Sequence, residues 1–196
     1  MQISAEFVTS ATDGRDFPHD RLPEIALIGR SNVGKSSLIN ALVRHQVART
    51  SAAPGKTRLA NFYRVRRGGP ALYLVDLPGY GYARGGDAAE REFNRLTDAY
   101  FGRADIDLGV LLLVDARHPG LESDLDAWAW LETQPCGRAV VGTKADKLTR
   151  AERARHTREF ESMFAVPVPL VSARTGEGLD ELWKLIAKLP NRRTAP

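Results

Sequence analysis

The sequence predicts an α/β protein of three layers, in which a mostly parallel central sheet is covered by helices on both faces. Two observations lead to this fold class. Short apolar runs with the length of buried strands alternate with segments whose apolar residues recur at helical spacing. A chain of 196 residues with 43% hydrophobic residues is also large enough to bury a substantial core. We expect a main domain over residues 23–190, preceded by an extension or edge strand over 1–22 and followed by a disordered tail over 191–196.

The predicted strands follow one another at short intervals. Leu59–Val65 alternates apolar and polar residues, whereas Ala71–Asp76 and Leu108–Asp115 are continuously apolar, as strands buried on both faces are. In chain order, the predicted strands are residues 1–8, Ile25–Gly29, Leu59–Val65, Ala71–Asp76, Leu108–Asp115, Arg138–Thr143 and Val168–Ser172.

Helical spacing is found between these strands, which implies a parallel sheet whose ligands bind at the carboxyl ends of the strands. The segment that follows Gly29 has apolar residues at helical spacing. We expect Trp128 and Trp183 in the core and Trp130, which lies off the apolar stripe, at the surface. The other helical patterns are Leu121, Leu125 and Trp128, and Leu179, Leu182, Trp183 and Ile186.

Composition and charge exclude several classes of protein. No apolar run approaches the roughly 20 residues that a membrane-spanning helix needs, and the first residues lack the basic start and apolar core of a signal peptide. The single cysteine, Cys136, allows no internal disulfide, which fits a reducing cytoplasm. With 28 basic and 24 acidic residues, the formal charge of +4 permits a nucleic-acid partner without requiring one. We expect a cytoplasmic monomer with no membrane association.

A phosphate-binding loop lies between the strand Ile25–Gly29 and the helix that follows it. The segment GRSNVGKS over residues 29–36 fits the pattern GxxxxGK[ST]. Its glycines let backbone N–H groups and the helix N-terminus face an anion, while Lys35 reaches the outer phosphates and Ser36 ligates Mg²⁺. The strand and helix on either side disfavour the alternative, a plain glycine-rich turn. The predicted phosphate-binding residues are Gly29, Arg30, Ser31, Asn32, Val33, Gly34, Lys35, Ser36 and Ser37.

The segment DLPG closes the buried strand Ala71–Asp76. Alone, this segment is an ordinary turn. Paired with a phosphate loop, its aspartate matches the acidic residue that holds Mg²⁺ through water. We therefore expect Asp76 on the metal side and the Gly79 N–H facing a γ-phosphate. The complete segment in this predicted site is Asp76, Leu77, Pro78 and Gly79.

Two further segments predict a guanine site rather than an adenine site. A carboxylate such as Asp146 accepts hydrogen bonds from the N1–H and the N2 amine of guanine, and adenine offers neither. Two such bonds at about 1.5–3 kcal/mol each separate GTP from ATP by about 3–6 kcal/mol. The Lys144 stem is expected over the base and the Ala173 N–H on its O6. The predicted base-binding residues are Thr143, Lys144, Ala145, Asp146, Val171, Ser172 and Ala173.

This ordered set of motifs looks like the translation-factor-related P-loop GTPases and closely resembles the EngB (YihA) family of bacterial ribosome-assembly GTPases. The resemblance rests on GRSNVGKSSLIN, ARTSAAPGKTR, LVDLPGYGYA, DARHPG and TKADKL, and it covers the chain from about Leu22 to Leu189. It implies the small-GTPase fold, GTP and GDP as ligands, and the large ribosomal subunit or its assembly intermediates as partner. An older description of the family implies an alternative role in cell division and septum formation.

The same resemblance assigns roles to individual residues. Thr57 matches the switch threonine that completes the Mg²⁺ ligands with Ser36 and Asp76, and Lys35, Thr57 and Gly79 match the catalytic positions. Pro54, Gly55 and Lys56 belong to the same switch segment. Thr143 stands where most GTPases have asparagine, and we expect it to lose an amide that ties the base-binding loops together, with modest guanine affinity as a result.

Tyr80 is the main departure from the Ras-like pattern, in which a glutamine orients the attacking water. A phenol cannot present an amide, so we expect slow intrinsic hydrolysis. This disfavours a third reading, a housekeeping nucleotide phosphohydrolase with fast turnover. Asn32 suggests K⁺ as an activator, although asparagine also stabilises tight turns. Four basic clusters are each compatible with an ordinary solvated face, and a basic surface that contacts ribosomal RNA is expected at the two that flank the predicted switches. These two are Arg64, Arg66 and Arg67, and Arg84, Arg91 and Arg95, and the others are Arg150, Arg153, Arg155 and Arg158, and Arg192 and Arg193.

Overall fold

A six-stranded sheet forms the centre of the computed structural model, which describes residues 3–49, 59–80, 86–103 and 106–190. The strand order is β1-β3-β4-β2-β5-β6, and β3 alone runs against the other strands. The sheet is therefore mostly parallel, as expected from the sequence. The strands are β1 (Ile3–Ala11), β2 (Glu24–Gly29), β3 (Ala60–Arg67), β4 (Leu72–Asp76), β5 (Leu108–Asp115) and β6 (Gly137–Thr143).

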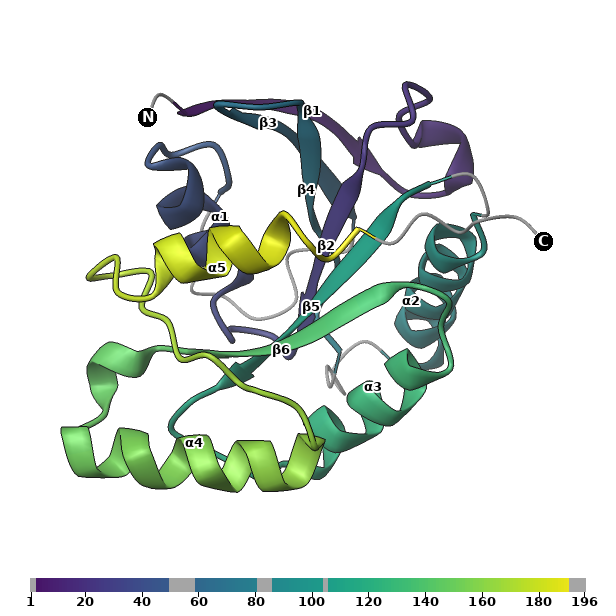
Figure 1. Ribbon diagram of the computed structural model, residues 1–196. Helices are drawn as coiled ribbons and strands as arrows, with labels where there is room; N and C mark the ends of the chain where they lie inside the picture. The colour runs from purple at the N-terminus through teal and green to yellow at the C-terminus, as the bar shows by residue number, and fades with distance from the viewer. Residues whose placement is uncertain (1–2, 50–58, 81–85, 104–105, 191–196) are drawn as a thin grey trace.

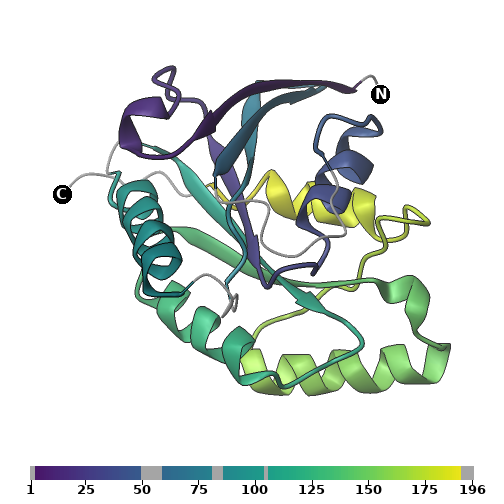
Figure 2. The same cartoon turned by 180° about the vertical axis from the view of Figure 1, so that it is seen from behind.

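Helices cover both faces of the sheet (Figures 1 and 2). Helices α1 and α5 pack on one face, and α2, α3 and α4 pack on the other, each with its own apolar cluster. The helices are α1 (Lys35–Val43), α2 (Gly86–Phe101), α3 (Glu122–Glu132), α4 (Arg150–Phe164) and α5 (Leu179–Ile186), with short 3₁₀ turns η1 (Gly14–Asp16) and η3 (Ala145–Lys147). Within the described ranges, no helix has the length and apolar character to cross a membrane.

Strand β5 explains why its sequence is a continuous apolar run. All of its residues are buried, and they alternate between the two clusters. Val110, Leu112 and Val114 join the cluster under α2, α3 and α4, whereas Leu111 and Leu113 join the cluster under α1 and α5. A strand with helices on both sides leaves no face for polar side chains.

The structure corrects the prediction of a strand over Val168–Ser172. This segment is extended and joins β6 through a single bridge between Gly142 and Leu170. Its hydrogen bonds run from Gly142 N–H to Pro169 O and from Val171 N–H to Gly142 O, at 2.9 and 2.7 Å. Pro167 and Pro169 have no N–H, so a longer ladder cannot form.

Within residues 1–22, left open as an extension or an edge strand, Ile3–Ala11 form the edge strand β1. It pairs with β3 from Ile3 opposite Arg67 to Ala11 opposite Ala60, with a register shift between Phe7 and Thr9. The tryptophan predictions are confirmed: Trp128 and Trp183 are buried, and Trp130 is exposed.

Candidate functional site

The phosphate loop joins the end of β2 to the start of α1 at the carboxyl edge of the sheet. Gly34 has a φ of 110° at the N-cap of α1, and Asn32 has a φ of 63°. These left-handed backbone positions turn the chain so that the helix N-terminus faces the loop, which is the geometry of an anion site. Lys35, the first residue of α1, is buried, and its Nζ donates to Gly29 O at 3.2 Å and Arg30 O at 3.4 Å.

Asp76 closes β4 beside this loop. Ser36 Oγ donates to Asp76 Oδ2 at 2.6 Å, and Asp76 Oδ1 is buried without a hydrogen-bond partner. Burial raises the pKa of Asp76 and lowers the pKa of Lys35, because each charged form is held away from water. A buried carboxylate oxygen beside a hydroxyl is the hard oxygen set that suits Mg²⁺, so these two residues fit the predicted metal position.

A pocket of about 320 Å³ lies beside the phosphate loop, where β6 and the segment after Val171 meet α1. Three parts of the chain predicted to bind nucleotide, 29–37, 143–146 and 171–173, each supply part of its wall. Leu38, Lys147 and Arg174 line it as well, and sequence reasoning did not identify them. The lining residues are Val33, Gly34, Ser37, Leu38, Thr143, Lys144, Asp146, Lys147, Val171, Ala173 and Arg174.

Asp146 is held in this pocket by Ser172. The Ser172 Oγ donates to Asp146 Oδ1 at 2.7 Å and accepts from the backbone N–H groups of Arg174 and Thr175. The hydrogen bond from Ser172 lowers the pKa of Asp146, so the carboxylate is an ionised acceptor at neutral pH. Ser172 thus fixes the group that we expect to read the base.

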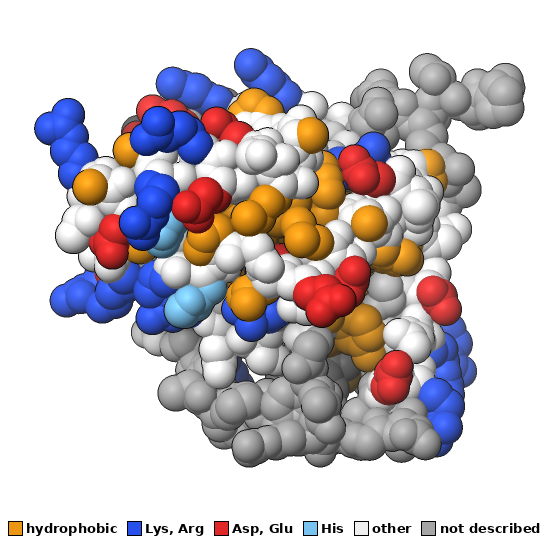
Figure 3. Space-filling view, turned by 90° about the horizontal axis from the view of Figure 1, so that it is seen from below, with side chains coloured by type: hydrophobic (Ala, Val, Ile, Leu, Met, Phe, Trp, Pro, Cys, Tyr) orange, Lys and Arg blue, Asp and Glu red, His pale blue; other side chains and the backbone are white. Residues whose placement is uncertain are grey.

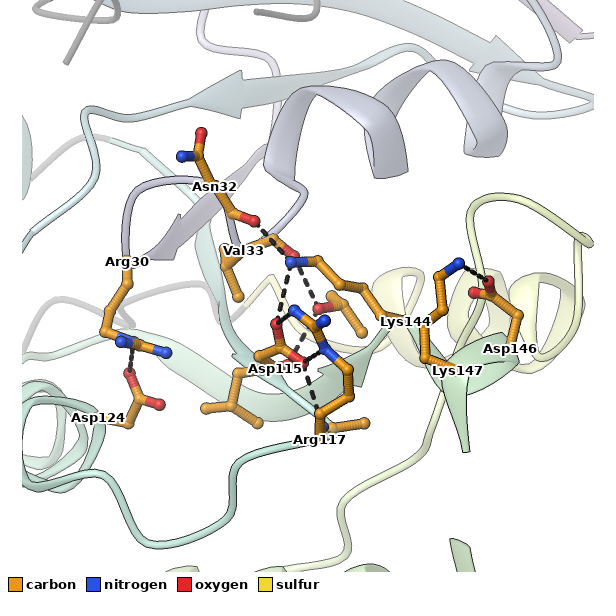
Figure 4. Close-up of polar contacts among 12 residues, drawn as sticks. Arg30, Asn32, Val33, Asp115, Arg117, Asp124, Lys144, Asp146 and Lys147 are labelled. Carbon is orange, nitrogen blue, oxygen red and sulfur yellow. Dashed lines mark hydrogen bonds and ion pairs between the residues drawn. The ribbon is translucent and has the colours of Figure 1, made fainter. Parts of the chain in front are cut away.

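Lys144 connects the base-binding segment to the phosphate loop. It adopts a left-handed backbone conformation, and its Nζ donates to Asn32 O at 2.7 Å and to Asp115 Oδ2 at 2.9 Å (Figure 4). Arg117 makes a two-pronged contact with the same carboxylate at 2.9 and 2.7 Å. Burial raises the pKa of Asp115, but the hydrogen bonds from Arg117 and Lys144 outweigh it, and the pKa lies well below its usual value. Asp115 and Arg117 were not among the predicted site residues.

Thr143 makes hydrogen bonds to neighbouring segments although it lacks the asparagine amide of most GTPases. Its buried Oγ1 lies 2.7 Å from Val33 O and 3.1 Å from Val114 O, which joins β6 to the phosphate loop. The two base-binding segments are joined by the Ala145 N–H to Val171 O bond at 3.1 Å and by the Ser172–Asp146 contact. The base-binding loops are therefore joined without an asparagine amide, and the modest guanine affinity expected from its loss stays a prediction.

We expect the Thr143→Val variant to bind GDP about threefold to tenfold more weakly than the wild type, because it leaves Val33 O without its side-chain donor while keeping the shape of the residue. Isothermal titration with GDP measures this. Thr157→Val on α4, outside the pocket lining, is the matched control and should leave GDP affinity unchanged. An equal effect of both variants would contradict a local role for the Thr143 hydroxyl.

The structure describes some of the predicted switch residues but not others. Pro54, Gly55, Lys56 and Thr57 lie outside the described residues. Gly79 lies directly over the phosphate loop: a Cβ added to it would meet Ser31 N at 2.8 Å and Lys35 Nζ at 3.0 Å. Leu77 and Pro78 are buried beneath this contact, and the Leu77 N–H donates to Leu27 O at 3.3 Å.

Two arginines of the first basic cluster have acidic neighbours. Arg64 lies 3.2 Å from Glu6 and 3.0 Å from Asp20, and Arg67 lies 2.6 Å from Asp180. Their charge is partly compensated, so they are weaker candidates for nucleic-acid contacts than the sequence suggested.

The face formed by α4 mixes both signs of charge (Figure 3). Arg153 contacts Glu177, and Arg155 lies 3.7 Å from Glu159. In the part of the chain that the structure describes, His, Cys, Asp and Glu form no group of three or more able to hold a metal. Arg84, Arg192 and Arg193 lie outside that part.

Beside the phosphate loop lie a buried aspartate and the TKxD pocket, all where the parallel strands end, and this arrangement is that of a P-loop GTPase. The family described as "50S ribosome-binding GTPase" matches residues 24–144, which include the phosphate loop and the end of β6. The protein named "Probable GTP-binding protein EngB" from Heliobacterium modesticaldum is 44% identical over 187 residues, covering 93% of this chain and 90% of that protein. Its namesake from Solibacter usitatus is 44% identical over 185 residues, covering 94% and 95%. The chain belongs to the EngB family of GTP-binding proteins.

Solved structures of GTPases share the fold of this chain. Era in complex with MgGDPNP and a segment of 16S ribosomal RNA is similar with a TM-score of 0.72 and 25% identity, over 91% of this chain. This chain spans 59% of the length of Era. A structure titled as a probable GTP-binding protein engB is similar in fold, with a TM-score of 0.63 and 22% identity over 84% of this chain and 97% of that one.

Proposed function

We propose that this GTPase acts as a nucleotide-controlled switch in the assembly of the large ribosomal subunit in the cytoplasm. The observation that carries the proposal is the match of residues 24–144 to a family described by its binding to the 50S ribosome. The likeness to Era, which was solved with ribosomal RNA, supports the same class of partner. GTP binding creates the ribosome-binding state, and hydrolysis releases the particle.

Separate parts of the site bind the base, the phosphates and the metal ion of GTP. The base enters the 320 Å³ pocket, where Asp146 accepts from its N1–H and N2 amine and the Ala173 N–H donates to its O6. Backbone N–H groups of the phosphate loop and Lys35 hold the phosphates. Ser36, Asp76 and Thr57 would hold Mg²⁺, which when bound stabilises the charge that develops on the transferring phosphoryl group. Water attacks the γ-phosphate in line and leaves GDP and phosphate.

Intrinsic hydrolysis is slow in this proposal. Tyr80 occupies the position that follows the DLPG segment, and its phenol donates to Asp124 at 2.9 Å, on α3. A side chain committed to that contact does not orient a water at the γ-phosphate. The partner, or an ion, then completes the catalytic arrangement.

K⁺ beside Asn32 is the ion that we propose as activator. The side-chain amide of Asn32 is exposed and points away from the Lys144 contact made by its backbone oxygen (Figure 4). We expect GTP turnover to be faster in KCl than in NaCl of equal ionic strength, and Asn32→Ala to remove the difference. Phosphate release measured in both salts, with and without ribosomes, tests this, and equal rates in every condition would contradict it.

Sedimentation with purified large ribosomal subunits tests the switch itself. We expect co-sedimentation in a non-hydrolysable GTP analogue but not in GDP, and weaker association at the higher of two salt concentrations, because phosphate contacts release counterions. Arg66 and Arg91 are exposed and are the first arginines to replace by glutamate. Absence of association in either nucleotide, with nucleotide binding verified, would contradict the proposal and favour a protein partner in cell division.

A further inference from the structure

Three parts of the chain meet at the buried carboxylate of Asp124. This residue lies in the first turn of α3 and is 2% exposed. Its Oδ1 accepts the Tyr80 hydroxyl at 2.9 Å, and Arg30 Nε of the phosphate loop lies 3.4 Å from the same oxygen. Figure 4 shows the Arg30 guanidinium directed at Asp124. We call these three side chains the Tyr80 latch.

The hydroxyl of Tyr80 makes the strongest contact in this latch. Arg30 Nε is buried, and its contact with Asp124 does not meet hydrogen-bond geometry, so it is an ion pair only. Burial raises the pKa of Tyr80, which keeps the phenol protonated and able to donate. The backbone adds a second link, since Arg30 and Tyr80 form an isolated parallel bridge. Tyr80 is thus fixed both to α3 and to the phosphate loop.

The latch bears directly on the nucleotide because Gly79 precedes Tyr80. A Cβ at Gly79 would lie 2.8 Å from Ser31 N and 3.0 Å from Lys35 Nζ, so the gap between Gly79 and the loop does not admit even one carbon atom without a shift. A γ-phosphate is a tetrahedral group that must contact this lysine. Its entry therefore requires Gly79 to move away from the loop, and Tyr80 has to move with it. A diphosphate lacks this third phosphate, so we expect it to leave Gly79 in place.

We propose that the Tyr80 latch holds Gly79 against the phosphate loop and thereby weakens the binding of GTP relative to GDP, with Asp124 as the positioning residue. The inference rests on the nucleotide site and is independent of the ribosomal partner. Binding of the third phosphate breaks or stretches the latch, so the latch can change the affinity ratio by no more than its own free energy. For a hydrogen bond to a carboxylate, this limit is about tenfold to a hundredfold.

The Tyr80→Phe variant tests the proposal because it removes the hydroxyl and keeps the ring. We expect the Kd for a non-hydrolysable GTP analogue to fall by about tenfold while the Kd for GDP stays the same. Fluorescence titration with labelled nucleotides measures both constants on the full chain. Asp124→Asn keeps a neutral acceptor for the phenol, so we expect a smaller change in the same direction. It also serves if Tyr80→Phe does not fold.

Tyr100→Phe is the matched control. Its hydroxyl donates to a buried carboxylate in the same way, to Glu24 Oε2 at 2.7 Å, but at the opposite end of β2 from the phosphate loop. Both variants lose one hydrogen bond, and only Tyr80→Phe should change the ratio of GTP to GDP affinity. An unchanged ratio in Tyr80→Phe and Asp124→Asn, or a ratio that moves equally in Tyr100→Phe, would overturn the proposal.

Discussion

Replacement of Asp146 by asparagine is expected to lower the affinity for GDP by about two to four powers of ten. The carboxylate offers an acceptor to each of two guanine donors, the N1–H and the N2 amine. An asparagine offers one acceptor, and its amide N–H groups face the N2 amine. The variant therefore loses a charge-assisted bond and gains a contact between two donors, and a partner left unpaired in a closed pocket costs more than a bond to water.

The same change should transfer affinity to xanthine nucleotides. Xanthine has a carbonyl where guanine has the N2 amine, so it accepts from the asparagine amide and still donates from N1–H. Titration of the variant with GDP and XDP measures both effects, and Asp126→Asn, on the exposed face of α3, is the control with an equal change of charge. If Asp146→Asn bound GDP as tightly as the wild type, the base could not be read at Asp146.

The ionisation state of Asp146 determines how its role as an acceptor depends on pH. The hydrogen bond from Ser172 holds the pKa of Asp146 below its usual value. The carboxylate then stays ionised as the pH falls from about 7 to about 5, since that range lies above even an unperturbed aspartate pKa. The acceptor for guanine is therefore retained over this range.

The local parts of the site were predictable from the sequence because each follows from a short pattern. The phosphate loop needs glycines at fixed spacing, and β5 needs an unbroken apolar run. The capping box between Thr149 and Glu152 marks the start of α4, although this segment was predicted only as a basic cluster. The helix is polar on most sides, with His156, Phe160 and Phe164 buried, so its apolar stripe is narrow.

Contacts between distant parts of the chain could not be predicted in the same way. Tyr80 and Asp124 are 44 residues apart, and no spacing rule joins them. The role of Thr143 was predicted from the asparagine amide that it replaces, whereas its hydroxyl donates to Val33 O, 110 residues earlier in the chain. Such pairs arise because the carboxyl ends of neighbouring parallel strands meet at one edge. The position of the site at the carboxyl ends of the strands was predictable. Which side chains contact one another there depends on how the helices pack.

A second cluster of contacts between distant residues lies at the opposite end of the strands, where β2 begins. It affects the stability of the fold. Glu24, the first residue of β2, is 1% exposed. Its Oε2 accepts from the Tyr100 hydroxyl at 2.7 Å and from Arg103 Nη2. The Arg103 guanidinium lies 4.6 Å from the centroid of the Phe17 ring and is mostly buried. The cluster therefore joins the end of α2 to the start of β2.

Replacement of Glu24 by alanine is expected to lower the free energy of unfolding by about 3–5 kcal/mol, because it leaves the Arg103 charge buried without its counterion. This is a large part of the roughly 5–15 kcal/mol that stabilises a typical domain. Burial raises the pKa of Glu24, as expected for a carboxylate that is costly to bury, so we expect the loss to come mainly from the orphaned partner. Urea unfolding without nucleotide measures the change, since bound GDP would add stability to the native state.

The double variant Glu24→Leu with Arg103→Met separates this cause from a simple loss of packing. It removes both charges and keeps apolar volume, so we expect it to be more stable than Glu24→Ala alone, even though it carries more substitutions. If the double variant were less stable than the single one, the orphaned Arg103 charge would not be the main cause of the loss in Glu24→Ala. If Glu24→Ala cost less than about 1 kcal/mol, the Arg103 charge must find water or another acceptor, and the cluster would not join α2 to β2.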